Sequence, residues 1–151
     1  TAANRYYQDS LAMYREFDHR LGTSLTLGGL GDVSVALGEI ESARKYFHEA
    51  YTLAQVIRDT PLLLWLLTGI AGLLAREKED ERAAELLGMV LNHYATTQEA
   101  RDKAEVILAG LGEAGHTPAL NAALERGKGM AKNKHPQRIS PEENRWLPLV
   151  T

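Results

Sequence analysis

The sequence predicts an all-α fold in which antiparallel helix hairpins stack into a solenoid. Three observations support this class: the chain repeats itself at a spacing of about 40 residues, apolar residues recur at helical spacing, and no segment keeps the period-two alternation of a strand. The 151 residues, of which 44% are hydrophobic and 25% charged, suit one compact repeat array better than two domains or a disordered chain.

The repeat becomes visible when the sequence is compared with a copy of itself that is shifted by one period. Small residues then fall on small ones and large residues on large ones in three successive copies. The matched sets are Ala3, Tyr6 and Tyr7, then Ala43, Tyr46 and Phe47, then Ala83, Leu86 and Leu87. Because chance seldom preserves side-chain size over three copies, we interpret the period as a structural repeat.

Seven helices are predicted in order along the chain, the first as a single helix and the others in pairs. Their ranges are 2–17, 24–37, 41–57, 61–76, 80–95, 98–111 and 117–126. Apolar residues follow the i, i+3, i+4, i+7 pattern most clearly in 41–57. The helix over 24–37 stops at Gly38, a good terminator, and Pro61 suits the first turn of the helix that it opens.

The predicted core consists of apolar residues that the repeat places at helix crossings. They are Leu30, Phe47, Ala50, Ile70, Ala83, Leu87 and Leu111. We expect residues 1–130 to form the repeat domain, with a half unit at 2–17, units at 24–57 and 61–95, and a last unit at 98–126 with a C-terminal cap. Residues 131–151 are expected to form a linker and an apolar tail.

Segment 24–57 resembles one tetratricopeptide (TPR) repeat, a unit of roughly 34 residues in this family. The positions of the family pattern are filled by Leu30-Gly31, Gly38, Ala43, Phe47 and Ala50. A weaker second unit has Ile70-Ala71, Ala83, Leu87 and Val90 at these positions. The aromatic pair of the family's first helix is missing, with Ser34 at one of its places. The resemblance implies a TPR-like right-handed superhelix of stacked antiparallel hairpins.

The long period is similar to the extended repeats at the C-terminal end of large bacterial signalling ATPases and of LuxR-type, MalT-like transcription regulators. Residues 108–130 look like the cap that ends such arrays. This resemblance implies a cytoplasmic, non-enzymatic scaffold for protein–protein interaction, from a bacterial regulatory or signalling protein, with a protein or peptide partner. The alternative is a sensor domain whose groove binds a small ligand or a peptide.

In the TPR pattern the first helices of the hairpins line a concave groove that receives the partner. The residues of this chain at those positions are Leu25, Gly28, Asp32, Val35, Ala36, Trp65, Thr68, Gly72, Ala75, Arg76, Glu105 and Leu108. Trp65 is the candidate anchor, with Arg76 and Asp32 beside it to orient a partner. The alternative interpretation is that Trp65 packs between repeats.

No residue pattern in the sequence indicates catalysis, a cofactor or a metal. There are no cysteines, the five histidines include neither an i, i+4 pair nor an HExxH motif, and no serine lies in a GxSxG motif. The acidic residues within 77–81 suit a solvated turn, and residues 28–32 suit a helix crossing better than a phosphate loop. We therefore expect no enzyme, no catalytic residue, no cofactor and no metal site.

Charge is distributed unevenly along the chain. Residues 126–151 carry six basic and two acidic side chains, whereas the whole chain has a net charge of −3, so the preceding part is acidic. An acidic body does not suit a phosphate backbone, which leaves nucleic-acid contact through the basic stretch 126–138 as the least favoured alternative. Residues 127–145 are typical of a linker. No apolar run approaches the roughly 18 residues of a membrane-spanning helix, so we expect no membrane partner.

Residues 2–17 match only the second helix of a unit, and they carry more apolar side chains than one following hairpin covers. An exposed apolar patch of this kind marks an interface. We therefore predict self-association, as a homodimer in its simplest form, with the apolar segment 146–150 as an alternative cover. The residues assigned to this role are Tyr6, Tyr14, Trp146, Leu147 and Leu149.

Overall fold

The computed structural model describes residues 1–112 and 115–132. Over these residues the regular structure consists of seven α-helices, without a strand, which confirms the predicted all-α class. The helices are α1 (Ala2–Glu16), α2 (Arg20–Leu37), α3 (Ile40–Ile57), α4 (Thr60–Arg76), α5 (Asp80–Asn92), α6 (Gln98–Ala109) and α7 (Pro118–Lys132).

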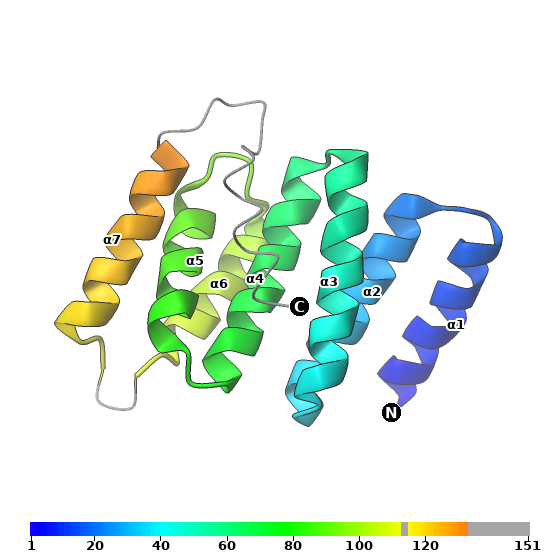
Figure 1. The fold of residues 1–151 in the computed structure, drawn as a ribbon, viewed down its shortest axis with the longest axis horizontal. Coiled ribbons are helices and arrows are strands. Elements are labelled where there is room, and N and C mark those ends of the chain that lie inside the picture. The colour runs from blue at the N-terminus through cyan, green and yellow to red at the C-terminus, as the bar shows by residue number, and fades with distance from the viewer. Residues whose placement is uncertain (113–114, 133–151) are drawn as a thin grey trace.

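The helices run up and down in turn and stand side by side, from α1 at one end of the array to α7 at the other (Figure 1). Each helix packs on the next as far as α6, and α2, α4 and α6 also touch one another in that order. The first helices of the hairpins therefore form one layer. This is the predicted solenoid, in which each hairpin buries against its neighbours a face that it cannot cover alone.

Local sequence signals set where the helices begin and end. The side chain of Asp59 accepts a hydrogen bond from the N–H of Leu62 (2.9 Å), and Pro61 occupies the first turn of α4. Gly38 ends α2 in the left-handed conformation, at φ 76°, which glycine adopts without strain.

Three predicted helix boundaries were wrong by three residues or more. α2 begins at Arg20 rather than at residue 24, because Nδ1 of His19 accepts a hydrogen bond from the N–H of Gly22 (2.8 Å) and caps the helix. Histidine is not a usual cap, so this start left no clear signal. α5 ends earlier than predicted, and α7 runs on to Lys132, so residues 127–132 of the predicted linker are helical.

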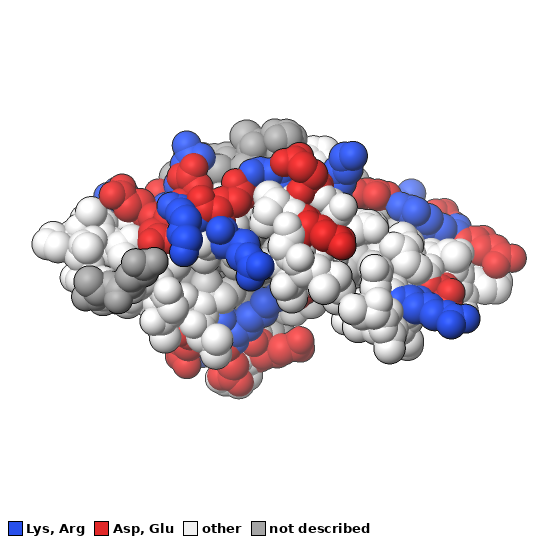
Figure 2. Space-filling view, turned by 90° about the horizontal axis from the view of Figure 1, so that it is seen from below, with Lys and Arg blue, Asp and Glu red and all other residues white. Residues whose placement is uncertain are grey.

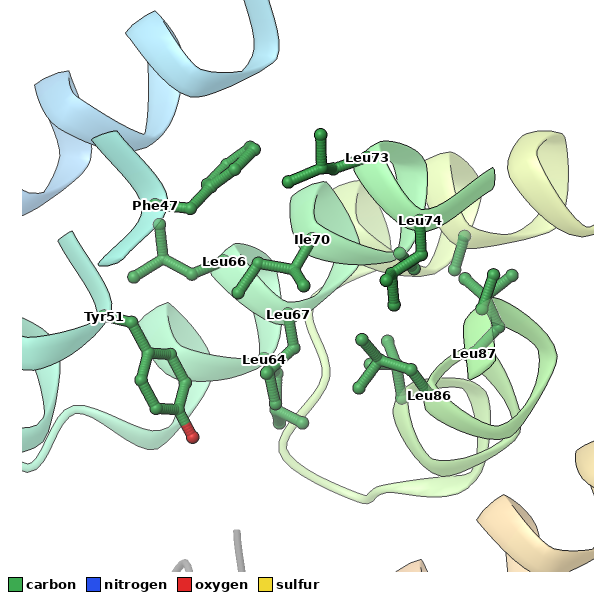
Figure 3. Packing of buried hydrophobic residues seen from close by; sticks show 14 of the residues in the cluster. Phe47, Tyr51, Leu64, Leu66, Leu67, Ile70, Leu73, Leu74, Leu86 and Leu87 are labelled. Atoms are coloured by element: carbon green, nitrogen blue, oxygen red, sulfur yellow. The ribbon is translucent and has the colours of Figure 1, made fainter. Parts of the chain in front are cut away.

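The core runs through the middle of the array, around α4 (Figure 3). The seven residues predicted for it are all buried, each at most 2% exposed: Leu30, Phe47, Ala50, Ile70, Ala83, Leu87 and Leu111. α4 contacts α2, α3, α5 and α6, which explains why most of its residues are apolar and buried.

Phe47 fills the space between two first helices. A Cβ built on Gly31 of α2, or on Gly69 of α4, would lie 2.7 Å from the Phe47 ring, closer than carbon atoms approach. The same contact occurs one repeat earlier, where Gly29 of α2 faces the ring of Tyr7. The glycines inside α2 and α4 therefore allow the close spacing of neighbouring helices.

α7 packs mainly along α5 rather than as the hairpin partner of α6. A Cβ on Gly88 of α5 would overlap the backbone carbonyl of Leu124, and a Cβ on Gly127 of α7 would overlap that of Glu85. Two backbones thus approach each other directly at this crossing. Within the C-terminal cap predicted over 108–130, the part that forms α7 lies against α5.

Gly127→Ala is expected to lower the free energy of unfolding by about 1–3 kcal/mol, because the added methyl group overlaps a backbone atom of α5. In Gly129→Ala, in the same helix, the added Cβ meets no atom of the described residues within 4 Å, so this change should raise the free energy of unfolding by up to about 1 kcal/mol through helix propensity. Urea unfolding measures both values. Equal effects of the two substitutions would contradict the close packing of α7 on α5.

Candidate partner-binding face

Asp32 of α2, Trp65 of α4 and Lys103 of α6 meet at the surface of the first-helix layer. Nζ of Lys103 lies 2.5 Å from Oδ2 of Asp32, so this ion pair ties α6 to α2 across α4. The same Nζ lies 5.7 Å from the centre of the Trp65 ring, within the range of a cation–π contact. We call these three residues the Trp65 cluster.

Trp65 is half-buried because part of its ring lies on α2. A Cβ built on Gly28 would lie 2.5 Å from the ring, so only a glycine leaves room for it. Part of the side chain is accessible to solvent. One side of the Trp65 ring therefore packs between repeats. The role of Trp65 as an anchor for a partner stays a prediction.

Burial dominates the electrostatics of Asp32. The pKa of its carboxyl is raised above the ordinary 3.8 because its position penalises the charged form. The charge of Lys103 and its hydrogen bond oppose this shift, and the charge of Glu99 adds to it. The side chains of Asp32 and Lys103 are 32% and 30% exposed, so water screens part of their attraction.

Lys103 was not predicted from the sequence, because the last period of the repeat is shorter than the first. α2 begins at residue 20 and α4 at residue 60, but α6 begins at residue 98 rather than at 100. Leu25, Trp65 and Lys103 therefore occupy the same place, five residues after the start of each first helix. This start was predicted correctly, and the side chain of Thr97 caps it by accepting a hydrogen bond from the N–H of Ala100 (3.2 Å). The groove positions were nevertheless carried into this helix at the 40-residue spacing, which selects residue 105 instead of 103.

Glu105 was assigned to the groove by extending the repeat period into α6. It is exposed, but two residues along a helix correspond to about 200° of rotation, which places it on the other side of α6 from Lys103. Glu105 therefore does not join the Trp65 cluster.

The other groove residues predicted on α2 lie on one side of the helix. Leu25, which is 44% exposed, and Val35, which is half-buried, share the side that carries Asp32. On α4 the prediction of Thr68 was wrong. Its side chain is fully buried and its hydroxyl donates a hydrogen bond to the carbonyl of Leu64 (2.8 Å), so it offers nothing to a partner.

Arg76 does not lie beside Trp65. It is exposed at the last turn of α4, where its guanidinium would lie 3.3 Å from a Cβ on Gly38 at the end of α2. Lys103 is therefore the cation that the structure places next to Trp65. Among the other positions carried over from the family pattern, Ala36 is exposed, Gly28 is buried, and Gly72, Ala75 and Leu108 are half-buried.

Of the residues assigned to self-association, Tyr6 is 68% exposed. Tyr14 is half-buried, with its ring over Gly22 and 5.2 Å from the centre of the His19 ring. Trp146, Leu147 and Leu149 lie outside the described residues, and so do residues 133–138 of the basic stretch.

Glu77 departs from the solvated turn that was expected for the acidic residues of 77–81. Its carboxylate pairs with Arg44 of α3, and the two side chains are only 21% and 24% exposed. This ion pair joins the end of α4 to the start of α3. The other acidic residues of the turn, Glu79 to Glu81, open α5, where negative charge is favoured by the helix dipole.

Metal-ligand groups, membrane-spanning helices and surface charge were each considered for the described part of the chain. Within residues 1–112 and 115–132, no three His, Asp or Glu side chains are grouped so that they could hold a metal ion. No described helix has the length and apolarity needed to cross a membrane. Figure 2 shows acidic and basic side chains interspersed on one face of the molecule, without a large area of one sign.

Asp32→Asn is expected to change how stability depends on pH. Because the folded chain protonates Asp32 more readily than the unfolded chain, this group contributes stability that is greatest below the ordinary pKa of 3.8 and is lost as pH rises through the folded pKa. The difference in free energy of unfolding, native minus variant, should therefore fall as the pH rises above 3.8.

Urea unfolding across this pH range checks that prediction. Lys103→Met removes the charge that lowers the Asp32 pKa, so it should enlarge the fall attributed to Asp32. A difference that rises with pH would show that the sign assigned to this group is wrong.

Comparison with known proteins identifies the repeat. The model of the tetratricopeptide repeat family matches residues 22–96, which run from the first turn of α2 to just beyond α5. Neither the search of curated proteins nor that of solved structures gave a match. Repeats of this family generally mediate protein–protein interaction and are typically non-catalytic scaffolds. The stacked hairpins and this match together show that the chain carries a TPR-like repeat domain.

Proposed function

We propose that this chain is a non-enzymatic scaffold that binds a protein or peptide partner through the Trp65 cluster. The observation that supports this proposal is an accessible aromatic ring beside a charge pair, on the layer that the first helices form. Buried or half-buried Trp side chains next to polar groups are enriched among the residues that dominate binding energy. Leu25 extends the apolar surface on the same side of α2.

The chemistry of the cluster indicates what kind of segment would fit. Asp32 and Lys103 neutralise each other, so the cluster attracts neither sign of charge strongly. The ammonium of Lys103 and the second carboxylate oxygen of Asp32 keep hydrogen-bonding capacity for backbone groups of a partner. The expected partner segment therefore places an apolar side chain on Trp65 and polar backbone atoms on the ion pair.

A small-ligand sensor remains the second candidate function. A pocket of about 440 Å³ lies at the α4–α5 turn and the start of α7, away from the Trp65 cluster. It is lined by Lys78, Glu79, Asp80, Glu81, Arg82, Gly112, Thr117 and Leu120. Because the pocket shares no residue with the Trp65 cluster, a ligand bound there would not use the groove predicted from the family pattern.

The long repeat period supports a finer proposal on biological context. Its similarity to the extended repeats of bacterial signalling ATPases and LuxR-type regulators favours a cytoplasmic regulatory protein as the parent of this domain. The partner would then be a protein that this domain recruits or senses.

Selection from a phage-displayed random peptide library on the immobilised chain tests the binding function. Trp65→Ala should weaken the selected peptides by at least about tenfold, because it removes the anchor. Arg82→Ala, at a 60% exposed side chain on α5, is the matched control and should leave their affinity unchanged. In a Trp146→Phe background, Trp65 is the sole tryptophan, and its fluorescence reports binding at the cluster directly.

Peptides that bind equally well to Trp65→Ala would contradict the site. Loss of binding in Arg82→Ala alone would place the binding surface at the α4–α5 turn and favour the second candidate.

A further inference from the structure

The α1 end of the array carries most of the large apolar side chains that the described residues expose. Tyr6 and Met13 of α1 and its C-cap residue Phe17 are 68%, 49% and 74% exposed, and Leu21 and Leu25 of α2 are 39% and 44% exposed. The other exposed large apolar residues are distributed over the array: Leu37, Val56, Tyr94 and Val106. Because an aromatic side chain covers about 150–250 Å², this end presents an apolar patch on the order of several hundred Å².

Comparison of α1 with α3, the equivalent helix of the next repeat, shows that α1 has fewer neighbouring helices within the described residues. α3 packs between α2 and α4, and Phe47 touches a glycine on each of them. Within the described residues, α1 has α2 and the edge of α3 on one side, and no helix on the other. Leu25 gives the same contrast, because its equivalent Trp65 is covered by the preceding first helix at Gly28.

We propose that a second copy of this chain covers the α1 face, with the two α1 helices packed antiparallel about a two-fold axis. Four exposed apolar residues share one face of this helix: Ala2, Tyr6, Met13 and Phe17. They are separated by four, seven and four positions, so the stripe has the same spacing from either end. An axis between residues 9 and 10 sets Tyr6 opposite Met13 of the second copy and Ala2 opposite its Phe17. Large residues thus meet small or flexible ones, and the stripe is complementary to itself.

The charges beside the stripe agree with this arrangement. Arg5 and Glu16 are both exposed and lie on the same flank of α1. With a rise of 1.5 Å per residue, an antiparallel pair brings Arg5 of one copy to within about 3 Å, along the helix axis, of Glu16 of the second copy. The symmetry forms this pair twice. Asp9 lies next to the axis and faces its own counterpart, which makes it the one unfavourable charge in the contact.

The stripe shares no residue with the Trp65 cluster, so the dimer does not depend on the proposed partner binding. An unrelated helix could also cover an apolar face. Binding such a helix does not need a symmetric stripe or self-complementary charges, whereas a two-fold contact between copies does. A contact built from one helix of each copy is small, and small interfaces are weak and reversible.

Sedimentation equilibrium of the 151-residue chain, at concentrations up to about 500 µM, tests the dimer, because weak interfaces have dissociation constants in the micromolar to millimolar range. Arg5→Glu and Glu16→Arg should each weaken dimerisation by at least about fivefold, since each sets like charges together at two places. The double variant should recover the native dissociation constant to within about twofold, because it restores opposite charges at both places. Circular dichroism checks that each variant is folded. If a charge-reversal variant unfolds, the corresponding neutral variant, Arg5→Gln or Glu16→Gln, takes its place.

Apolar and acidic variants complete the experiment. Tyr6→Ser should weaken dimerisation by at least about tenfold, whereas Tyr94→Ser, at a tyrosine that is 64% exposed elsewhere, should have no effect. Asp9→Asn should tighten dimerisation, and Glu81→Gln, which removes the same charge on α5, should not.

A chain that stays monomeric over this range would overturn the proposal. A dimer that survives Tyr6→Ser and both charge reversals would overturn it as well. Association that is lost on deleting residues 140–151, but not on changing α1, would show that the apolar tail forms the contact instead.

Discussion

Aromatic rings set against glycines determine how closely the helices of this molecule stack. Phe47 lies between Gly31 and Gly69, and the ring of Trp65 lies on Gly28. Each glycine inside a helix costs about 1 kcal/mol relative to alanine. Full burial of the Phe47 ring contributes about 1.5–3 kcal/mol, which offsets the cost of about 2 kcal/mol for the two glycines that it faces. Because each ring packs against a glycine of a neighbouring first helix, the match of a large residue with a small one also sets the relative position of successive hairpins.

The candidate site is a consequence of this stacking. Trp65 keeps part of its ring at the surface because Gly28 receives only one side of it. The layer formed by α2, α4 and α6 then brings together Asp32 and Lys103, which are 71 positions apart in the chain. Burial of the Asp32 carboxyl raises its pKa more than the charge of Lys103 lowers it, so burial decides the direction of the shift.

Side-chain size and spacing made the helices, the repeat and the core predictable, because Phe47, Ala50 and Ile70 must lie inside wherever the helical period holds. The site was predictable only in part. The repeat predicts that Trp65 and Asp32 lie in the first-helix layer. The position of Lys103 depends on the spacing between the starts of the first helices, which is two residues shorter from α4 to α6 than from α2 to α4. The burial of Thr68 depends on how α4 is rotated about its own axis. The packing of α7 on α5 depends on backbone contact at Gly88 and Gly127, and Gly127 lies in the stretch that the sequence predicts as a linker.

The most direct test of the glycine–aromatic contact is a double-mutant cycle on Gly31 and Phe47, measured as the free energy of unfolding in urea. Gly31→Ala in the native chain should cost about 1–3 kcal/mol in spite of its better helix propensity, because the new methyl group meets a ring that Gly69 confines from the other side. In a Phe47→Leu background the ring atoms that the new methyl group would meet are absent. There Gly31→Ala should leave the free energy of unfolding unchanged or raise it. A cost that is the same in both backgrounds would contradict the account.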